Sequence, residues 1–187
     1  MKARIVPPQL EPDAAAVPVP LDVVETLLFA HVQARQMVAV AQALASSSAT
    51  PSTAEAAASV ERWLRTALAR HMDDEELSLA PRLTGFHEVV DRALVTMRSD
   101  HFREAAMTAR LAGLCGVLRR DVSMLHALRF PLAQAVAELA QLLAHHQALE
   151  ESILFPALRR FLKRPELAAI DAEMHSRRGP KPLAALN

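Results

Sequence analysis

The chain has 187 residues, of which 51% are hydrophobic, and it contains only 4 Gly. This length supports one domain with a sizeable core, and a composition rich in Ala and Leu without β-branched runs predicts an all-α protein. The formal net charge is +0, which argues against nucleic acid or an anionic membrane as the main partner.

The expected location of the protein is the cytoplasm. The single cysteine, Cys115, excludes an intrachain disulfide, and disulfides are rare in reducing compartments. The first residues lack the hydrophobic segment of a signal peptide, and no apolar run reaches the roughly 20 residues of a membrane span. We therefore expect neither a secreted nor a membrane-spanning protein.

The N-terminal part of the chain predicts an extended arm followed by a helix. Residues 1–20 hold five of the 12 prolines, which favours an extended arm. Asp22 is suited to cap the helix that follows. Apolar residues then alternate at spacings of three and four, the pattern of a bundle seam, and His31 lies among them. A single histidine on an apolar face is more often a core residue than a ligand.

The next segment predicts a second helix that carries both a histidine and a glutamate. Residues 46–51 have the composition of a loop, and Ser52 with Glu55 matches a capping box. His71 and Glu75 then lie in the apolar seam of the helix. The seam places both side chains toward the core.

A third predicted helix repeats features of the first. Its seam runs over residues 90–115, and His101 has the same apolar context as His31. Gly113 and Gly116 indicate that the helix weakens near its end.

The fourth predicted helix begins near Pro131, which suits a first helical turn. His146 and Glu150 lie in its seam. Residues 117–130, which come before it, carry no clear pattern. A short fifth helix is expected over residues 166–177, closed by a glycine.

One motif occurs twice in the sequence. Residues 71–81 and 146–156 both read His, three residues, Glu-Glu, two residues, Leu, one residue, Pro. The final proline is expected to end or kink each helix. A single His–Glu pair would be interpreted as an exposed helical contact, but repetition within two apolar stripes favours a metal site. Residues i and i+4 of a helix share one face, so each copy presents an imidazole and a carboxylate to one point: His71 with Glu75, and His146 with Glu150.

The predicted architecture is an antiparallel up-down four-helix bundle with a short fifth helix at the C-terminus. The bundle is expected over residues 21–164, after the arm at 1–20 and before the short helix and tail at 165–187. Two antiparallel helices at about 1.5 Å per residue return the chain to the same level. The separations of two histidine pairs along the chain fit such a return: His31 with His71, and His101 with His146.

Six side chains are therefore expected at one level of the bundle. They are too many for one tetrahedral zinc, but they suit two metals that each bind two histidines and share two carboxylates, with an open position for binding or chemistry. Nitrogen and oxygen donors suit iron, manganese, zinc or nickel, and the lack of thiolates argues against an iron–sulfur cluster. The predicted metal ligands are His31, His71, Glu75, His101, His146 and Glu150.

With these features the sequence resembles the hemerythrin-like, or HHE cation-binding, family. The resemblance rests on His31 and His101 in their apolar contexts and on the two copies of the His–Glu–Glu motif, and it spans roughly residues 21–179. It implies a four-helix bundle with two carboxylate-bridged, non-haem iron ions, for which manganese or zinc is the alternative. Family members bind dioxygen, respond to oxygen, nitric oxide or iron, or help to repair damaged iron centres.

One position departs from the oxygen-carrying members of this family. They have a further histidine four residues after the third-helix ligand, where this sequence has Ala105. The set of four histidines and two glutamates is therefore closer to the sensor and repair members. Glu104, one turn after His101, is an alternative ligand at this place.

The remaining histidines and neighbouring glutamates are assigned to supporting or surface positions. His145 would give the longer spacing to Glu150 that oxygen carriers have, but the internal repeat favours His146. The other such residues are interpreted as exposed, structural or outer-sphere groups: His87, His126, His175, Glu76 and Glu151.

The expected function follows from the resemblance. We expect a di-metal protein that binds, senses or reacts with dioxygen, nitric oxide or peroxide, or that takes part in iron handling or iron-centre repair. One alternative is a redox enzyme that consumes peroxide or oxidises iron, without a tyrosyl radical because the chain has no Tyr. A bundle with a purely structural metal is the other. The expected partner is the small ligand itself, with a homodimer as a possible assembly.

Overall fold

The computed structural model describes residues 22–179. Short connections apart, this part of the chain is helical and contains no strand, so the fold is all-α, as the composition predicts. The arm predicted over residues 1–20 lies outside the described residues, as do residues 180–187 of the tail. Within the described part, no helix has both the length and the apolar character needed to cross a membrane.

The helical elements follow one another with short connections. Three π-helical turns, η1, η2 and η4, widen the α-helices without ending them, so residues 51–83 and 125–161 form two continuous helical segments. The 3₁₀ turn η3 precedes the second of these segments. The bounds of the elements are α1 Val23–Ser46, α2 Pro51–Trp63, η1 Leu64–Leu68, α3 Ala69–Asp74, η2 Glu75–Leu79, α4 Ala80–Leu83, α5 Glu88–Arg120, η3 Val122–Met124, α6 Leu125–Leu149, η4 Glu150–Leu154, α7 Phe155–Phe161 and α8 Arg164–Arg178.

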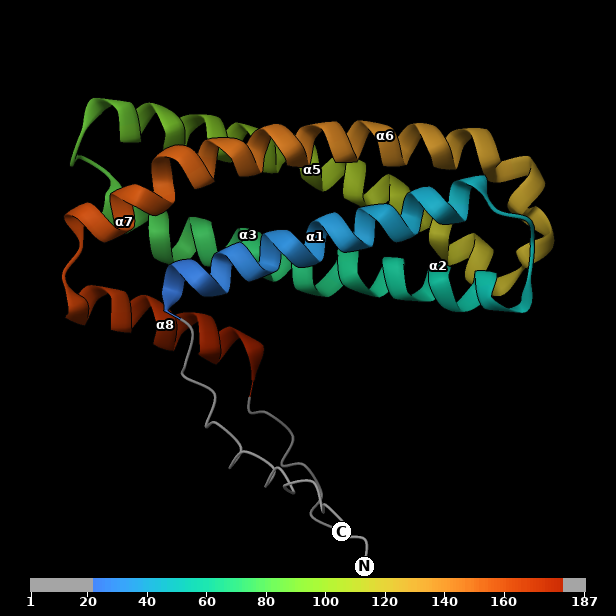
Figure 1. The fold of residues 1–187 in the computed structure, drawn as a ribbon, viewed down its shortest axis with the longest axis horizontal. Coiled ribbons are helices and arrows are strands. Elements are labelled where there is room, and N and C mark those ends of the chain that lie inside the picture. The colour runs from blue at the N-terminus through green and yellow to red at the C-terminus, as the bar shows by residue number, and fades with distance from the viewer. Residues whose placement is uncertain (1–21, 180–187) are drawn as a thin grey trace, which may run out of the picture.

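Long helical segments lie side by side along the long axis of the molecule (Figure 1). Helix α1 contacts α2 and α6, and helix α5 contacts the same two neighbours. The C-terminal helix α8 packs against α1, α3 and η2. The described segments therefore bring distant parts of the sequence into contact.

Both ends of the described chain carry the predicted helix signals. The side chain of Asp22 accepts a hydrogen bond from the backbone N–H of Glu25, and the side chain of Glu25 accepts one from the backbone N–H of Asp22, so a capping box starts α1. Gly179 follows α8 with a φ of 70°, a conformation that glycine adopts without strain. Local sequence signals thus place these two boundaries correctly.

The start of α2 differs from the prediction. The capping box is formed by Thr50 and Thr53, whose hydroxyl accepts from the Thr50 backbone N–H at 2.9 Å, and not by Ser52 and Glu55. Pro51 occupies the first turn of α2, where its fixed φ suits a helix and its missing N–H costs nothing. The helix therefore begins before Ser52.

The third and fourth helices also depart from the prediction. Helix α5 continues through Gly113 and Gly116. A Cβ at Gly116 would lie 3.2 Å from Oε1 of Glu61 in α2, so a larger residue there would require the Glu61 side chain to shift. Pro131 lies inside α6 and does not start it. The side chain of Asp121 caps the turn η3, which leads directly into α6 at an earlier residue.

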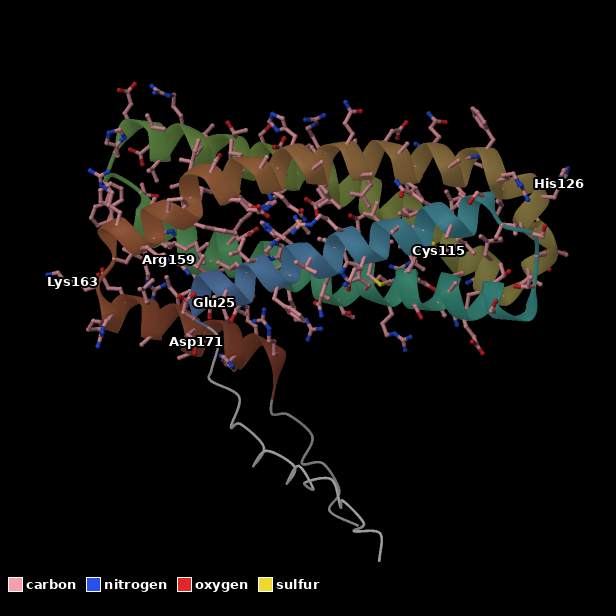
Figure 2. All side chains as sticks on the ribbon, in the orientation of Figure 1. Glu25, Cys115, His126, Arg159, Lys163 and Asp171 are labelled. Carbon is pink, nitrogen blue, oxygen red and sulfur yellow. The ribbon has the colours of Figure 1, made fainter. Side chains whose placement is uncertain are left out.

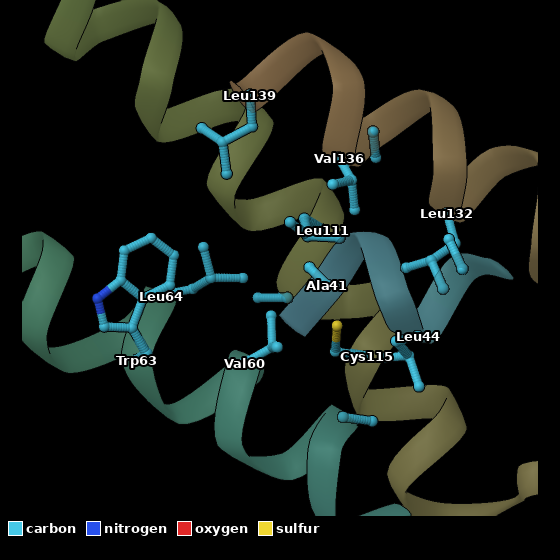
Figure 3. Packing of buried hydrophobic residues seen from close by; sticks show 14 of the residues in the cluster. Ala41, Leu44, Val60, Trp63, Leu64, Leu111, Cys115, Leu132, Val136 and Leu139 are labelled. Carbon is cyan, nitrogen blue, oxygen red and sulfur yellow. The ribbon is translucent and has the colours of Figure 1, made fainter. Parts of the chain in front are cut away.

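Two apolar clusters fill the interior, one toward each end of the long axis. The first is formed by α1, α2, α5 and α6 and surrounds Cys115 (Figure 3). The second is formed by the start of α1, α4, the start of α5, α7 and α8. Each long segment passes from one cluster to the other near a buried histidine. The flanking pairs of cluster residues are Leu27 and Ala34, Leu68 and Leu79, Met97 and Leu111, and Leu143 and Leu154.

Candidate metal centre

Polar side chains from four helical segments meet between the two apolar clusters. Figure 2 shows nitrogen and oxygen atoms gathered among the helices near the middle of the molecule. All six predicted ligands are buried, and the most exposed of them, His71, has only 6% of its surface accessible. Buried polar groups of this kind need a partner, because desolvation otherwise costs several kcal/mol.

The six side chains form two overlapping groups of potential metal ligands. Within each group, one ligand atom from every residue lies within 4.8 Å of all the others. The two glutamates belong to both groups, and each group adds its own pair of histidines. The first group is His31, His71, Glu75 and Glu150, and the second is Glu75, His101, His146 and Glu150.

Each shared glutamate directs its two oxygens to different histidine pairs. Oε1 of Glu75 lies 3.1 Å from Nε2 of His71, and Oε2 lies 3.3 Å from Nε2 of His101. Oε2 of Glu150 lies 3.2 Å from Nε2 of His31, and Oε1 lies 3.0 Å from Nε2 of His146. The distance from His31 to Glu150 agrees within 0.1 Å with that from His101 to Glu75. The distance from His71 to Glu75 agrees equally well with that from His146 to Glu150. The duplication in the sequence is thus also a duplication of geometry.

The donor atoms are spaced as ligands of a common ion would be. Two donors bound at about 2.1 Å to one ion and at right angles lie about 3.0 Å apart. The Nε2 atoms of His101 and His146 are 3.1 Å apart, and the nitrogen–oxygen distances are similar. Among the described residues, neither oxygen of Glu75 or Glu150 has a hydrogen-bond partner, and neither has Nε2 of His31 or His71. Metal coordination by these unpartnered atoms would offset their desolvation, so the donor set fits a metal site.

The comparisons with known proteins give no family for this chain. No protein-family model matches the sequence, and no curated protein matches it. The buried His and Glu groups themselves fit a metal site. Their nitrogen and oxygen donors are compatible with iron, manganese or zinc.

The second glutamate of each repeated motif holds a histidine of a neighbouring helix. Oε1 of Glu151 lies 2.8 Å from Nδ1 of His31, and Oε1 of Glu76 lies 2.7 Å from Nδ1 of His101. A carboxylate on Nδ1 keeps the proton there and leaves the lone pair of Nε2 for a metal. The sequence predicted an outer or surface position for these two glutamates, and the structure places both outside the two ligand groups, each in contact with a histidine of one group.

His146 faces a carboxylate that the sequence analysis missed. Oδ2 of Asp100 lies 3.8 Å from Nδ1 of His146, and Asp100 is buried. Only its position directly before His101 could have indicated it. Among the described residues, neither Nδ1 of His71 nor Nδ1 of His146 has a hydrogen-bond partner, in contrast to Nδ1 of His31 and His101.

A π-helical turn begins at each of the two shared glutamates. In η2 the N–H of Ala80 bonds the carbonyl of Glu75, and in η4 the N–H of Phe155 bonds the carbonyl of Glu150. The proline of each motif lies just beyond the turn, and a proline would clash with the carbonyl four residues earlier in a regular α-helix. The wider turn allows the helix to continue, so these prolines do not end it. The glutamate that begins each turn remains buried in the core.

Burial keeps two of the histidines in the neutral form that binds metals. It lowers the pKa of His71 to about 3, only partly offset by the charge of Glu150. Burial, followed by the charge of His146, also lowers the pKa of His101. Burial acts to lower the pKa of His146 too, but its contacts with Glu150 raise that pKa above the ordinary value.

The two shared glutamates differ in their affinity for a proton. Burial raises the pKa of Glu75 well above its usual range, and the adjacent charge of Glu150 acts in the same direction. Burial also favours the protonated form of Glu150, but its contacts with His146 and His31 hold the pKa of Glu150 below its usual range. A cation between the two carboxylates would favour the ionised form of both.

The other histidines lie outside the cluster. His145 is exposed whereas His146 is buried, which agrees with the choice made from the repeat. His126 projects from the end of the molecule where α5 turns into α6 (Figure 2). His87 caps α5 by accepting a hydrogen bond from the N–H of Val89. The exposed His175 lies on α8, with its Nδ1 3.2 Å from Oδ1 of Asp171. None of these four histidines belongs to either ligand group.

Helix α8 holds the segment that carries Glu75. The fully buried Asp74 accepts hydrogen bonds from Arg177 at 2.7 Å and from Arg178 at 2.6 Å. Ser78 donates to Glu173 of the same helix at 2.6 Å. The second copy of the motif has Leu149 and Ile153 at the corresponding positions. The two ends of the ligand cluster are therefore supported differently.

Proposed function

We propose that this chain is a hemerythrin-like protein, an up-down four-helix bundle that holds two non-haem iron ions and binds, senses or reacts with dioxygen, nitric oxide or peroxide. The observation that carries the proposal is the division of Glu75 and Glu150 between two pairs of histidines. Two carboxylates that each face two imidazole pairs are what a bridged pair of metals requires, and a single structural ion would not need this arrangement.

The chain supplies the preorganised part of such a site. Glu76 and Glu151 orient His101 and His31 from neighbouring helices, so these rings do not need to rotate when a metal binds. The apolar clusters on both sides keep bulk water away from the ligands. An iron pair, when bound, supplies the capacity to exchange electrons and to coordinate a small ligand.

The ligand count favours sensing or reaction over a purely structural role. Each ion would have two histidines and two shared carboxylates from the protein, which leaves positions for an exogenous ligand. A groove between α1 and α6 is lined in part by Ala34, Ala144 and Ala148 and also by Glu151, the residue whose Oε1 lies 2.8 Å from Nδ1 of His31. A diatomic molecule or peroxide is small enough to enter such a groove.

Metal analysis with optical spectroscopy tests the proposal. The full chain, purified in air, should contain about two iron ions and show near-ultraviolet bands of an oxidised iron pair. The bands should bleach on anaerobic reduction and return on exposure to dioxygen. One zinc ion, or no metal, with a featureless spectrum would refute the proposal. Rapid turnover of added peroxide would instead identify the enzyme alternative.

A further inference from the structure

Three of the four clustered histidines have a carboxylate near Nδ1, the ring nitrogen that is turned away from the shared glutamates. A glutamate oxygen lies 2.8 Å from Nδ1 of His31 and another lies 2.7 Å from Nδ1 of His101. For His146 the corresponding atom is Oδ2 of Asp100, at 3.8 Å. Asp100 therefore has the same place relative to its histidine as the two glutamates, at a longer distance.

Asp100 is buried, and one of its oxygens is free to accept a hydrogen bond. Only 5% of its surface is accessible. Oδ1 accepts a hydrogen bond from Arg103 at 3.3 Å, whereas Oδ2 has no hydrogen-bond partner among the described residues, and neither has Nδ1 of His146. Buried polar atoms are normally paired, and a hydrogen bond between these two neighbouring atoms would satisfy both.

Metal binding at Nε2 decides where the proton of His146 lies. Nε2 lies 3.0 Å from Oε1 of Glu150 and 3.1 Å from Nε2 of His101, so this nitrogen is directed at the ligand cluster. A neutral imidazole that binds a metal through one nitrogen carries its proton on the other. The proton of a metal-bound His146 is therefore on Nδ1, on the side of Asp100. An approach of about 1 Å would bring the two atoms to ordinary hydrogen-bond length.

The other half of the centre lacks this carboxylate. Asp100 directly precedes His101, whereas the residue directly before the corresponding His31 is Ala30. An alanine side chain offers no acceptor, and Nδ1 of His71 has no hydrogen-bond partner among the described residues. Loss of Asp100 should therefore affect one half of the centre and leave the other as an internal reference.

We propose that Asp100 is a positioning residue for His146: it accepts a hydrogen bond from Nδ1–H when Nε2 binds a metal, and so fixes the tautomer and orientation of the ring. The inference rests on the metal centre proposed above. A carboxylate behind a metal-bound histidine makes the imidazole a stronger donor. Asp100 therefore strengthens the binding of the ion held by His101 and His146.

Zinc(II) titration of the metal-free, full-length protein, combined with NMR of its labelled histidine rings, tests this role. Competition with a chelator gives the affinity of each equivalent, and long-range proton–nitrogen spectra show which ring nitrogen carries the proton. The variants are Asp100→Leu, which removes the acceptor, and Asp100→Asn, which keeps one acceptor oxygen without the charge. Urea unfolding of each metal-free variant verifies that it is folded.

Two further variants are matched controls. Arg103→Ala removes the contact to Oδ1 of Asp100 and leaves Oδ2 in place. Glu138→Gln changes another carboxylate that lines the same groove between α5 and α6. Glu138 accepts a hydrogen bond from Arg110 at 2.9 Å, and its hydrogen bonds to described residues do not include one to a histidine.

In the zinc-loaded wild-type protein, His146 should carry a proton on Nδ1 that exchanges slowly with solvent. In Asp100→Leu this proton should exchange rapidly, and one of the two zinc equivalents should weaken by about 10–100-fold. The Nδ1 protons of His31 and His101 should stay as in wild type, because their glutamates remain. Asp100→Asn should recover most of the affinity, and both controls should behave as wild type.

Other outcomes separate the role of Asp100 from the proposed metal pair. Unchanged affinities and an unchanged His146 signal in Asp100→Leu would overturn this role and leave the pair intact. Weaker binding without a change at His146 would also overturn it, since Asp100 would then act only through the fold. An equal loss in Asp100→Asn or Arg103→Ala would overturn it too, because both variants keep an acceptor.

The number of zinc equivalents tests the pair itself. A single equivalent in wild type, weakened in Asp100→Leu together with a change at His146, would support Asp100 and refute the pair. No zinc binding by the wild-type protein would refute both.

Discussion

Glu151 and His31 are 120 positions apart in the sequence, yet Oε1 of the glutamate lies 2.8 Å from Nδ1 of the imidazole. Glu76 and His101 make the same contact at 2.7 Å in the other half of the centre. The first glutamate of each motif thus serves as a candidate ligand, and the second orients a candidate ligand on another helix. These two separate roles explain why the motif carries two consecutive glutamates.

Removal of an orienting carboxylate should weaken metal binding without abolishing it. We expect Glu151→Ala to lower the affinity for one of the two ions by about 10–100-fold, because the His31 ring loses its fixed tautomer and orientation. Competition with a chelator measures the change. Arg35→Ala is the control, since Arg35 donates a hydrogen bond to Glu151 at 3.2 Å, and its hydrogen bonds to described residues do not include one to the histidine. An equal loss in the control would show that the charge network, and not the histidine contact, sets the affinity.

Neighbouring histidines offer a matched test of the ligand assignment. His146→Ala should lose metal, because His146 is buried among the candidate ligands, whereas His145→Ala should retain it because His145 is exposed. The same contrast is expected between His101→Ala and His126→Ala. Metal content per folded chain provides the measurement. Metal loss in the His145 or His126 variant would contradict the positions described above.

Glu104 should make the metal-free protein less stable as the pH rises. Burial raises its pKa from 4.5 to about 7 in the folded chain, so between these values the folded state keeps a proton that the unfolded state releases. The contribution of Glu104 to the free energy of unfolding therefore falls across this interval and is constant above it. Relative to wild type, Glu104→Gln should gain on the order of 1–3 kcal/mol between pH 4.5 and pH 8. Urea unfolding at the two pH values measures this, and a pH-independent difference would contradict it.

The contact between α8 and the ligand-bearing helix should contribute to stability. Asp74→Asn should lower the free energy of unfolding by about 1–3 kcal/mol, because the amide keeps only one acceptor oxygen, so one hydrogen bond from the arginines is lost and the other no longer has a charged acceptor. The ion pair between Arg159 and Asp22 is more than half exposed on both sides, so Arg159→Ala should cost less than about 1 kcal/mol. Denaturant unfolding of both variants compares them directly. Equal effects would show that burial of Asp74 does not strengthen its contacts.

Features of the fold that depend on local sequence were predictable. The cap at Asp22, the stop at Gly179 and the apolar seams follow from residues a few positions apart. The predicted start of helix four at Pro131 was wrong, because the cap at Asp121 begins the helical path earlier. Helix α5 continues past Gly116, where the sequence predicted it to weaken, and its packing partner α2 lies far away in the sequence.

The same distinction applies to the candidate site. The two His–Glu pairs were readable because their members lie one turn apart on one helix. The role of Asp74 could not be read from the sequence, since its partners Arg177 and Arg178 are more than 100 positions away. Glu104 was visible as an alternative ligand, but only its burial by the neighbouring helices shows that both of its oxygens lack partners. Sequence spacing identifies donors on one helix, and the packing of other helices determines their surroundings.

The exchange of glutamates between the two halves of the chain has an evolutionary consequence. The half formed by residues 22–83 contributes both histidines of one ligand group but relies on Glu150 of the other half to complete it. Residues 88–161 likewise rely on Glu75. An ancestor consisting of a single repeat would have held an incomplete site, and two copies associated about a twofold axis would have completed both sites together. Gene fusion would then have made that association permanent and left each half free to diverge, as the difference between Asp74 and Leu149 illustrates.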